Sequence, residues 1–213
     1  MRTFLKTLAI ISGSLLFSGS TLAQTIVLNK PNLEREGNLM KALSQRASAR
    51  EFDSTPLSIQ DLSDLLWAAN GVNRVESGKR TAPSAINAQD IDIYVFDSNG
   101  VYLYNAQKHI LEGVVNGDYR KIISNQDKDP YPALILLLVS DISRFTRADD
   151  SLKTEWAAMD AGIVSQNIML FCSSAGMESR PRAFMKKSEI NELLQLGTTK
   201  LPMLNIPVSY KKR

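Results

Sequence analysis

The stretch Ala133-Leu-Ile-Leu-Leu-Leu-Val139 decides how this chain folds. It is a continuous apolar run of strand length, bounded by Pro132 and Asp141. Such a run is typical of a strand that is buried on both faces, rather than of one with a solvated side. We therefore expect it at the centre of a sheet that helices flank.

A long helical pattern follows this run. Residues Ser151 to Ala175 contain no proline and a single glycine and end at Gly176, which predicts about seven turns of helix. The apolar residues from Trp156 through Phe171 wrap more than one face, so we expect the helix to be covered on most sides. The pattern leaves two explanations open, a subunit interface or an ordinary central helix.

Shorter patterns complete the expected fold. We expect further helices over residues 38–45, 58–70 and 188–196, and further strands over residues 91–96, 101–104 and 204–210. Helices and strands are mixed without regular βαβ alternation, so the predicted class is α+β. Residues 71–80 are expected to form a mobile connector, and residues 116–129 either a lid or a surface loop.

The N-terminus, residues 1–23, has the form of a secretory signal peptide. Arg2 and Lys6 give a positive region, and an apolar run covers Leu8 to Phe17 before small residues at the cleavage position. The run is too short for a comfortable membrane span, although an uncleaved anchor is the alternative. We therefore expect export, to the bacterial periplasm, of one domain over residues 24–213 that has no membrane anchor.

Composition excludes several classes of protein. Hydrophobic residues make up 44% of the chain and charged residues 22%, as in ordinary globular proteins. The net charge is +3, of which the signal contributes two basic residues and no acidic ones, so the mature chain is nearly neutral and a poor candidate for nucleic-acid binding. Cys172 is the one cysteine and lies in an apolar segment, where we expect it to be buried. Zinc spacing, a P-loop and Gly-x-Gly-x-x-Gly are absent, so no metal site is expected.

Two segments carry chemistry. Residues 45–53 read Gln-Arg-Ala-Ser-Ala-Arg-Glu-Phe-Asp, with Arg46, Ser48 and Arg50 directly after a predicted helix. Two guanidinium groups and a hydroxyl suit a doubly charged phosphate, although the same spacing also fits a solvated helix face. Residues 81–89 read Thr-Ala-Pro-Ser-Ala-Ile-Asn-Ala-Gln, a small-residue loop with an amide inside it, which alone would indicate only a turn.

In these segments the chain resembles the nitroreductase family of FMN-dependent oxidoreductases, in the style of the SagB-like branch that includes azoline dehydrogenases. The resemblance covers residues 39–210, and its motifs are Arg46–Phe52, Ala82–Gln89 and Asp160–Met177, with Arg180–Phe184 after the helix. It implies a mostly antiparallel central sheet flanked by helices, and a homodimer with two FMN sites at an interface formed by the long helix.

The resemblance also implies which residues bind FMN. Residues 46–50 would contact the phosphate and ribityl chain, the loop at 83–87 would reach the flavin across the dimer, and backbone amides near 182–183 would lie beside its N5 atom. The implied FMN-binding residues are Arg46, Ala47, Ser48, Arg50, Pro83, Ser84, Ala85, Asn87, Arg182, Ala183 and Lys211. Three positions depart from the usual pattern: Ala47 replaces a basic or aromatic residue, Ser209 replaces a glycine, and Lys211 stands either at the phosphate or in a frayed end.

The implied activity passes electrons through bound flavin to a nitro, quinone or related small-molecule acceptor in a ping-pong order. No acid–base catalytic residue is expected, because the flavin carries the redox chemistry. NAD(P)H is one electron donor to consider, but it is a cytosolic compound and the signal indicates export. The alternatives are an exported flavin-dependent dehydrogenase or oxidase that takes electrons from its own substrate, and a flavin-binding protein without turnover.

Overall fold

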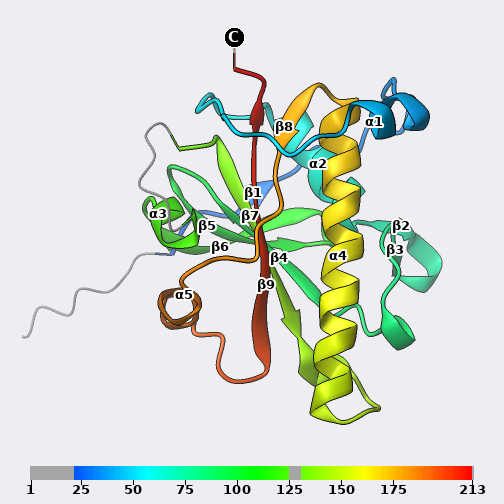
Figure 1. The fold of residues 1–213 in the computed structure, drawn as a ribbon, viewed down its shortest axis with the longest axis vertical. Coiled ribbons are helices and arrows are strands. Elements are labelled where there is room, and N and C mark those ends of the chain that lie inside the picture. Colours follow the sequence, from blue (N-terminus) through cyan, green and yellow to red (C-terminus); the bar gives the residue numbers. More distant parts are fainter. Residues whose placement is uncertain (1–21, 125–130, 213) are drawn as a thin grey trace, which may run out of the picture.

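An antiparallel sheet forms the centre of the computed structural model, which describes residues 22–124 and 131–212 (Figure 1). Its seven strands in this part of the chain are β1 (Ile26–Val27), β4 (Ile91–Phe96), β5 (Gly100–Asn105), β6 (Ile110–Asn116), β7 (Leu134–Asp141), β8 (Met177–Ser179) and β9 (Lys200–Tyr210). They lie in the order β1-β6-β5-β4-β7-β9-β8, and each neighbouring pair is antiparallel. The predicted α+β class with an antiparallel central sheet is confirmed.

Helices cover both faces of this sheet. They are α1 (Leu39–Gln45), α2 (Ile59–Asn70), α3 (Arg120–Ser124), α4 (Asp150–Ser174) and α5 (Lys187–Leu194). In Figure 1, α2 and α4 stand on one side of β9, and α3 and α5 on the other. The ends of α2 lie where the sequence indicates, because the Ser58 hydroxyl accepts the backbone N–H of Asp61 at 3.1 Å and Gly71 follows the last turn.

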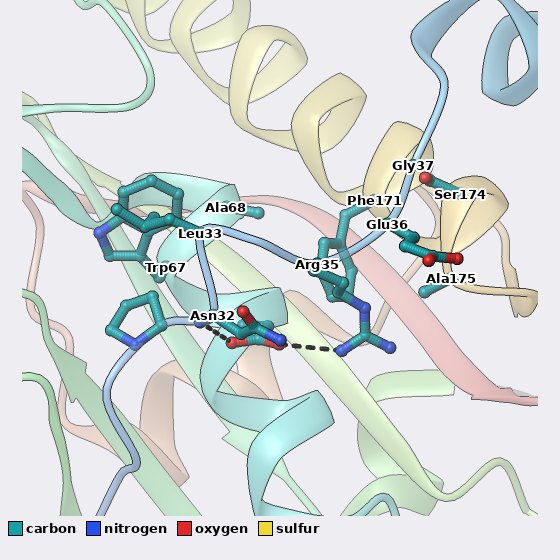
Figure 2. Close-up of a pocket in the computed structure, with 12 residues that line it drawn as sticks. Asn32, Leu33, Arg35, Glu36, Gly37, Trp67, Ala68, Phe171, Ser174 and Ala175 are labelled. Carbon is teal, nitrogen blue, oxygen red and sulfur yellow. Dashed lines mark hydrogen bonds and ion pairs between the residues drawn. The ribbon is translucent and has the colours of Figure 1, made fainter.

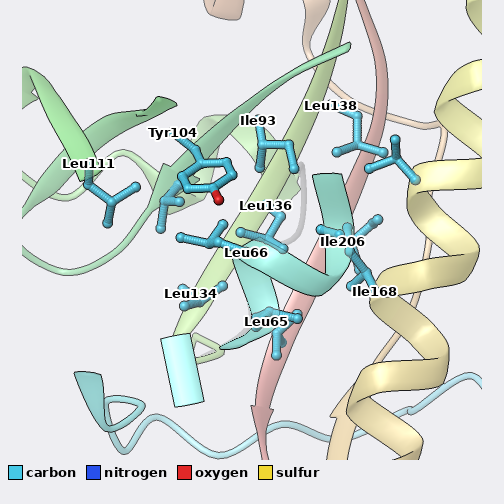
Figure 3. Close-up of a cluster of buried hydrophobic side chains, with 14 of the residues drawn as sticks. Leu65, Leu66, Ile93, Tyr104, Leu111, Leu134, Leu136, Leu138, Ile168 and Ile206 are labelled. Atoms are coloured by element: carbon cyan, nitrogen blue, oxygen red, sulfur yellow. The ribbon is translucent and has the colours of Figure 1, made fainter. Parts of the chain in front are cut away.

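Strand β7 has a core on each side, as its apolar run predicts. Leu134, Leu136 and Leu138 pack with α2 and α4 in one hydrophobic cluster (Figure 3). Ile135, Leu137 and Val139 point to the opposite face, into the cluster that α3 and α5 cover. The alternation of side chains along a strand sends the two sets to opposite faces, so both must be apolar.

Helix α4 begins and ends within one residue of its predicted bounds. Asp149 caps its N-terminus by accepting the backbone N–H of Leu152 at 2.9 Å. Its buried residues form one stripe, which faces the sheet, and Cys172 in that stripe is fully buried as predicted. Met159, by contrast, is 62% exposed. The expected cover on the remaining faces is therefore not supplied by the described part of this chain.

The expected connector over residues 71–80 is a structured hairpin instead. Strands β2 (Val72–Arg74) and β3 (Lys79–Arg80) pair around the 3₁₀ turn η1 (Val75–Ser77), and the Trp67 indole donates to the carbonyl oxygen of Val72 at 3.0 Å. The prediction of a mobile connector was wrong because Gly78 adopts a left-handed conformation, φ 62°, that allows a tight turn between the two strands.

Two further boundaries needed correction. Strand β9 begins four residues before the predicted start, since Pro202 is accommodated opposite Val139, where the register of β7 and β9 shifts. Helix α3 and the end of β6 occupy part of the stretch 116–129 that was expected to be a lid or loop, and residues 125–130 lie outside the described part. Strands β1 and β8 are too short for sequence periodicity to reveal.

Candidate functional site

Residues 46–50 run as an extended segment from the end of α1 past strand β8. Arg46 caps α1 through its backbone N–H, which donates to the carbonyl oxygen of Ala42 at 2.9 Å. Ala49 is buried, and its N–H donates to the carbonyl oxygen of Ser179 at 3.1 Å. Anchoring at Ala49 leaves its neighbours Ser48 and Arg50 exposed, so the polar side chains of the motif face outward.

Arg46 and Ala47 line a hollow of about 80 Å³ together with Lys211 from the far end of the chain. Ser173 and Glu178 line the same hollow. The Arg46 guanidinium has no hydrogen bond or ion pair within the described residues. Two cations and one carboxylate meet here, which leaves a net positive charge where an anionic group of a ligand can be held.

The C-terminal segment is held beside this hollow. Lys212 lies 3.5 Å from the carboxylate of Glu51. Ser209 is buried, accepts the backbone N–H of Asp53 at 3.0 Å and donates to the carbonyl oxygen of Tyr210 at 2.7 Å. The departure from glycine at Ser209 therefore ties the last strand to the segment that follows residues 46–50.

Arg182 and Ala183 lie on a segment that pairs with the middle of strand β9. Arg182 and Asn205 exchange both backbone hydrogen bonds at 2.8 Å, and the Asn205 side chain donates to the carbonyl oxygen of Phe184 at 3.1 Å. Ala183 itself is exposed. A fixed backbone next to an exposed residue is the arrangement that presents main-chain groups to a ligand.

The Arg182 side chain has an unused donor. Its guanidinium carbon stands 5.8 Å from the centre of the Phe52 ring, which places it beside the segment 46–52. Its Nε atom is buried and has no hydrogen-bond partner in the described part of the chain. Burial lowers the pKa of Arg182 from its ordinary value, and Arg180 lowers it further. A buried donor without an acceptor is what a polar ligand atom would satisfy.

The loop with Pro83, Ser84, Ala85 and Asn87 is held in a strained shape. Its 3₁₀ turn η2 (Ala85–Asn87) places Ile86 at φ 48° and Asn87 at φ 57°, conformations that residues other than glycine adopt rarely. The Ser84 hydroxyl accepts the N–H of Gln89 at 2.8 Å, and Pro83 and Asn87 are exposed. The loop keeps these conformations because its backbone is hydrogen-bonded to helix α4.

One of two adjacent buried carboxyl groups, that of Asp160, holds the loop. Asp160 on α4 accepts the N–H of Ala85, and next to it Asp90 accepts the hydroxyl of Ser140 at 2.5 Å. Asp90 is 0% and Asp160 3% exposed. Burial, together with the neighbouring Asp160, raises the pKa of Asp90 to about 7, although the Ser140 hydrogen bond opposes the shift. Asp90 therefore keeps its proton below about pH 7.

The loop and the hollow are separate within one chain. Asp160 beneath the loop and Met169 in the hollow are nine residues apart on α4, which is about 14 Å along the helix axis. The structure thus brings Arg46, Ala47 and Lys211 together, with Arg182 next to their segment, but leaves the loop at another place on the same helix.

Sequence reasoning did not assign roles to Asp160, Asp90 and Glu178. A signal for Asp160 exists, because it falls among Ala157, Ala161 and Val164 on the buried stripe of α4, where a carboxylate needs a specific partner. Asp90 and Glu178 lie in ordinary polar contexts, and their roles depend on which strand ends meet.

A second hollow, of about 280 Å³, lies between residues 31–37, α2 and the end of α4 (Figure 2). Arg35 in this hollow is paired with Asp61 at 2.6 Å and Asp64 at 2.9 Å, and its guanidinium lies 5.2 Å from the centre of the Phe171 ring. Its cation is thus already neutralised, and none of the residues implied to bind FMN lines this hollow.

Comparison with known proteins agrees with this architecture. The model of the nitroreductase family matches residues 43–210. A Methanocaldococcus jannaschii protein described as a nitroreductase candidate is 30% identical over 200 residues, which is 89% of this chain and 99% of that protein. A crystal structure described in the same terms, from Ralstonia eutropha, is 34% identical with a TM-score of 0.83, over 90% of this chain and 91% of that one.

The chain therefore belongs to the nitroreductase family, and it is an oxidoreductase of nitroreductase type. A subunit of the Escherichia coli microcin synthetase McbBCD complex shares the fold alone, with 19% identity and a TM-score of 0.70, over all of this chain and 85% of that one. The SagB-like branch is thus not established for this protein.

Across the described residues, every helix is too short or too polar to cross a bilayer.

Proposed function

We propose that this protein is an FMN-dependent oxidoreductase that passes electrons to a nitro, quinone or related small-molecule acceptor. The observation that carries the proposal is the hollow where Arg46 and Lys211 converge at one end of the segment 46–52, whose other end, Phe52, lies next to the guanidinium of Arg182. The Nε of Arg182 lacks an acceptor within the described residues. Cationic groups at one end of the segment and an unused donor at the other fit a cofactor with a phosphate and a polar ring edge. Bound FMN would supply reversible two-electron transfer, with donor and acceptor using one open face in ping-pong order.

The residues of this chain would bind and orient. Arg46, Ser48 and Arg50, helped by Lys211, would neutralise the phosphate with charge-assisted hydrogen bonds, and Ala47 would contribute only backbone. Arg182 and Ala183 would present a side-chain donor and a main-chain group to the ring. Glu178 in the hollow would oppose the phosphate charge unless it pairs with Lys211 or Arg46, so binding is expected to strengthen when this carboxylate is removed.

A second copy of the chain would complete the site. The loop at residues 83–87 lies about 14 Å along α4 from the hollow, so Pro83, Ser84, Ala85 and Asn87 cannot join residues 46–50 within one chain. Met159 and Ile86 are exposed apolar residues on α4 and on the loop, and a homodimer through this surface would bury them. In that arrangement the loop of one protomer would reach the flavin of the other.

The cellular compartment of the protein limits which electron donors it can use. With the signal sequence at residues 1–23, we propose export to the periplasm, where NAD(P)H is not available by any route that the chain suggests. The identity of the compound that reduces the flavin then distinguishes three functions. A nitroreductase takes electrons from NAD(P)H, and a dehydrogenase or oxidase takes them from its own substrate. A flavin-binding protein without turnover is reduced by neither.

The test is reconstitution of the purified mature chain with FMN, followed by anaerobic addition of NADH, NADPH or neither. About one FMN per chain is expected, with bleaching of the flavin absorbance on reduction and recovery of that absorbance when a nitroaromatic or quinone is added. A chain that takes up no flavin at saturating FMN would contradict the proposal. A chain that binds FMN but is reduced by neither nucleotide would favour its own substrate as donor.

A further inference from the structure

A pocket that is separate from the proposed flavin site lies beside the β2–β3 hairpin. Its volume is about 360 Å³, and its lining joins the hairpin, the loop after Asn87, the ends of β4, β5 and β6, and the 3₁₀ turn η3 (Ile142–Arg144). Polar groups on its wall include Arg80, Gln89, Asn105 and Arg144. None of the residues implied to bind FMN lines it.

Arg80 is the unusual member of this lining. It is half-buried, and its Nε atom is buried with no hydrogen-bond partner among the described residues. No carboxylate in the described chain forms an ion pair with it. Burial lowers the pKa of Arg80 from its ordinary value and Arg144 lowers it too, although Asp92, Tyr104 and Asp90 oppose the shift from a distance. The structure thus holds a partly desolvated cation that lacks a direct counter-ion.

The nearby carboxylates are engaged elsewhere. Asp92 takes both of its hydrogen bonds from Nη2 of Arg144, each at 2.8 Å, and the other Nη of Arg144 donates to the carbonyl oxygen of Gln89. Glu112 accepts the side-chain amide of Asn105 at 2.8 Å and lies 3.9 Å from the ammonium of Lys108. Only Arg80 on this wall is left without an anion.

An unpaired charge that is half out of water is unfavourable, and a ligand anion that pairs with it would relieve that cost. The two Nη atoms of a guanidinium are a parallel pair of donors, which matches the two oxygens of a planar carboxylate, and the Nη atoms of Arg80 are not among its buried atoms. The rest of the wall is partly apolar, and its lining includes Ala88, Tyr104 and Ala106. Such a lining suits the body of a small organic molecule rather than a bare inorganic ion.

We propose that this pocket binds the carboxylate of a small organic acid, with Arg80 as the anchor and Tyr104 and Ala106 covering the apolar part of the ligand. The pocket shares none of the residues implied to bind FMN, and it would serve either an acidic substrate or an acidic effector. Its existence does not depend on whether FMN binds.

The test is calorimetric titration of the full mature chain with benzoate, with benzamide as the neutral analogue of the same shape, and with inorganic phosphate. Benzoate is expected to bind, and benzamide and phosphate to bind at least about tenfold more weakly, because only benzoate offers both a carboxylate and an apolar body. Arg80→Gln is expected to weaken benzoate binding about tenfold or more and to leave benzamide unchanged. Lys79→Gln, a charge removal at the adjacent exposed position, is expected to change neither.

Folding of the variant is checked by its thermal transition without ligand. Because Arg80 has no partner to lose within the described chain, Arg80→Gln is expected to melt at the wild-type temperature or above. Arg80→Lys, which keeps the charge but not the fork, is expected to restore part of the benzoate affinity. Equal binding of benzoate and benzamide, undiminished benzoate binding by Arg80→Gln, or conversion of a dimer to monomers by this variant would each overturn the proposal.

Discussion

Both carboxylate oxygens of Asp160 accept the backbone N–H of Ala85, at 2.8 and 3.1 Å. The contact joins residues 75 positions apart and fixes the strained loop of Ile86 and Asn87 to the middle of α4. A short hydrogen bond to a buried carboxylate thus determines where the exposed amide of Asn87 stands.

Removing that acceptor should release the loop. Asp160→Ala leaves the N–H of Ala85 without a partner, so we expect a loss of about 1–3 kcal/mol in the free energy of unfolding. Asp160→Asn keeps an acceptor oxygen and should lose less than half as much. Chemical denaturation of the two variants measures both values, and equal stability of Asp160→Ala and wild type would show that the loop does not depend on this contact.

The raised pKa of Asp90 predicts a pH dependence of stability. The pKa of Asp90 is about 7 in the folded chain and lies near its ordinary value of 3.8 when unfolded, so the folded state binds the proton more tightly. The free energy of unfolding should therefore fall as pH rises from about 4 to about 7 and level off above that, at about 1.4 kcal/mol per unit of pKa difference.

Asp90→Asn should flatten this slope, because the amide mimics the protonated acid at every pH. Asp150→Asn, which removes an exposed carboxylate from the first turn of α4, serves as the control and should keep the wild-type slope. Thermal melts across pH 4–9 decide the matter. A wild-type slope in Asp90→Asn would mean that other groups cause it.

Arg46→Ala should weaken FMN binding. If Arg46 holds the phosphate, its loss removes charge-assisted hydrogen bonds worth roughly 1.5–3 kcal/mol, so affinity should fall about tenfold to a hundredfold. The apo protein should change by less than about 0.5 kcal/mol, since the guanidinium has no partner in the described chain. Fluorescence titration with FMN measures the affinity. Lys41→Ala on α1 is the control, and equal, negligible effects of both would make Arg46 a solvated residue.

Met159→Lys should disrupt the proposed homodimer. Met159 is 62% exposed on α4, so a lysine there costs the isolated chain little but would bury a charge in an interface between copies. Sedimentation should show monomers for this variant and dimers for wild type. Glu192→Lys, on α5 at the opposite face of the sheet, is the control and should remain dimeric. A stable, FMN-loaded wild-type monomer at micromolar concentration would refute the interface.

Export should leave a mature chain that begins at Gln24. In the uncut chain Ala23 packs closely on Gly113, where no side chain has room because the Ala23 carbonyl oxygen would meet it. Cleavage after Ala23 removes this contact and should loosen the edge of β6. N-terminal sequencing of the native protein measures the cut directly, and retention of Met1 on a cytosolic product would be incompatible with export.

The sequence by itself determined the parts of the fold whose pattern is long and regular. The apolar run of β7 is readable because both faces are buried, and α4 because 25 residues pass without a proline. Capping by Ser58 is a local hydrogen bond, so local sequence predicts it. The segments with Arg46, Ser48 and Arg50 and with Asn87 were likewise visible as motifs in order along the chain.

Only the tertiary structure decided which of these residues meet. Lys211 joins Arg46 because β9 runs antiparallel between β7 and β8, and Asp160 reaches Ala85 across 75 residues because α4 passes beneath the loop. The unpaired state of Arg80 is likewise a property of its surroundings, since Arg144 occupies Asp92 only once η3 and β4 are adjacent. Such contacts depend on long-range packing, and no local pattern of residues encodes a partner that lies on another element.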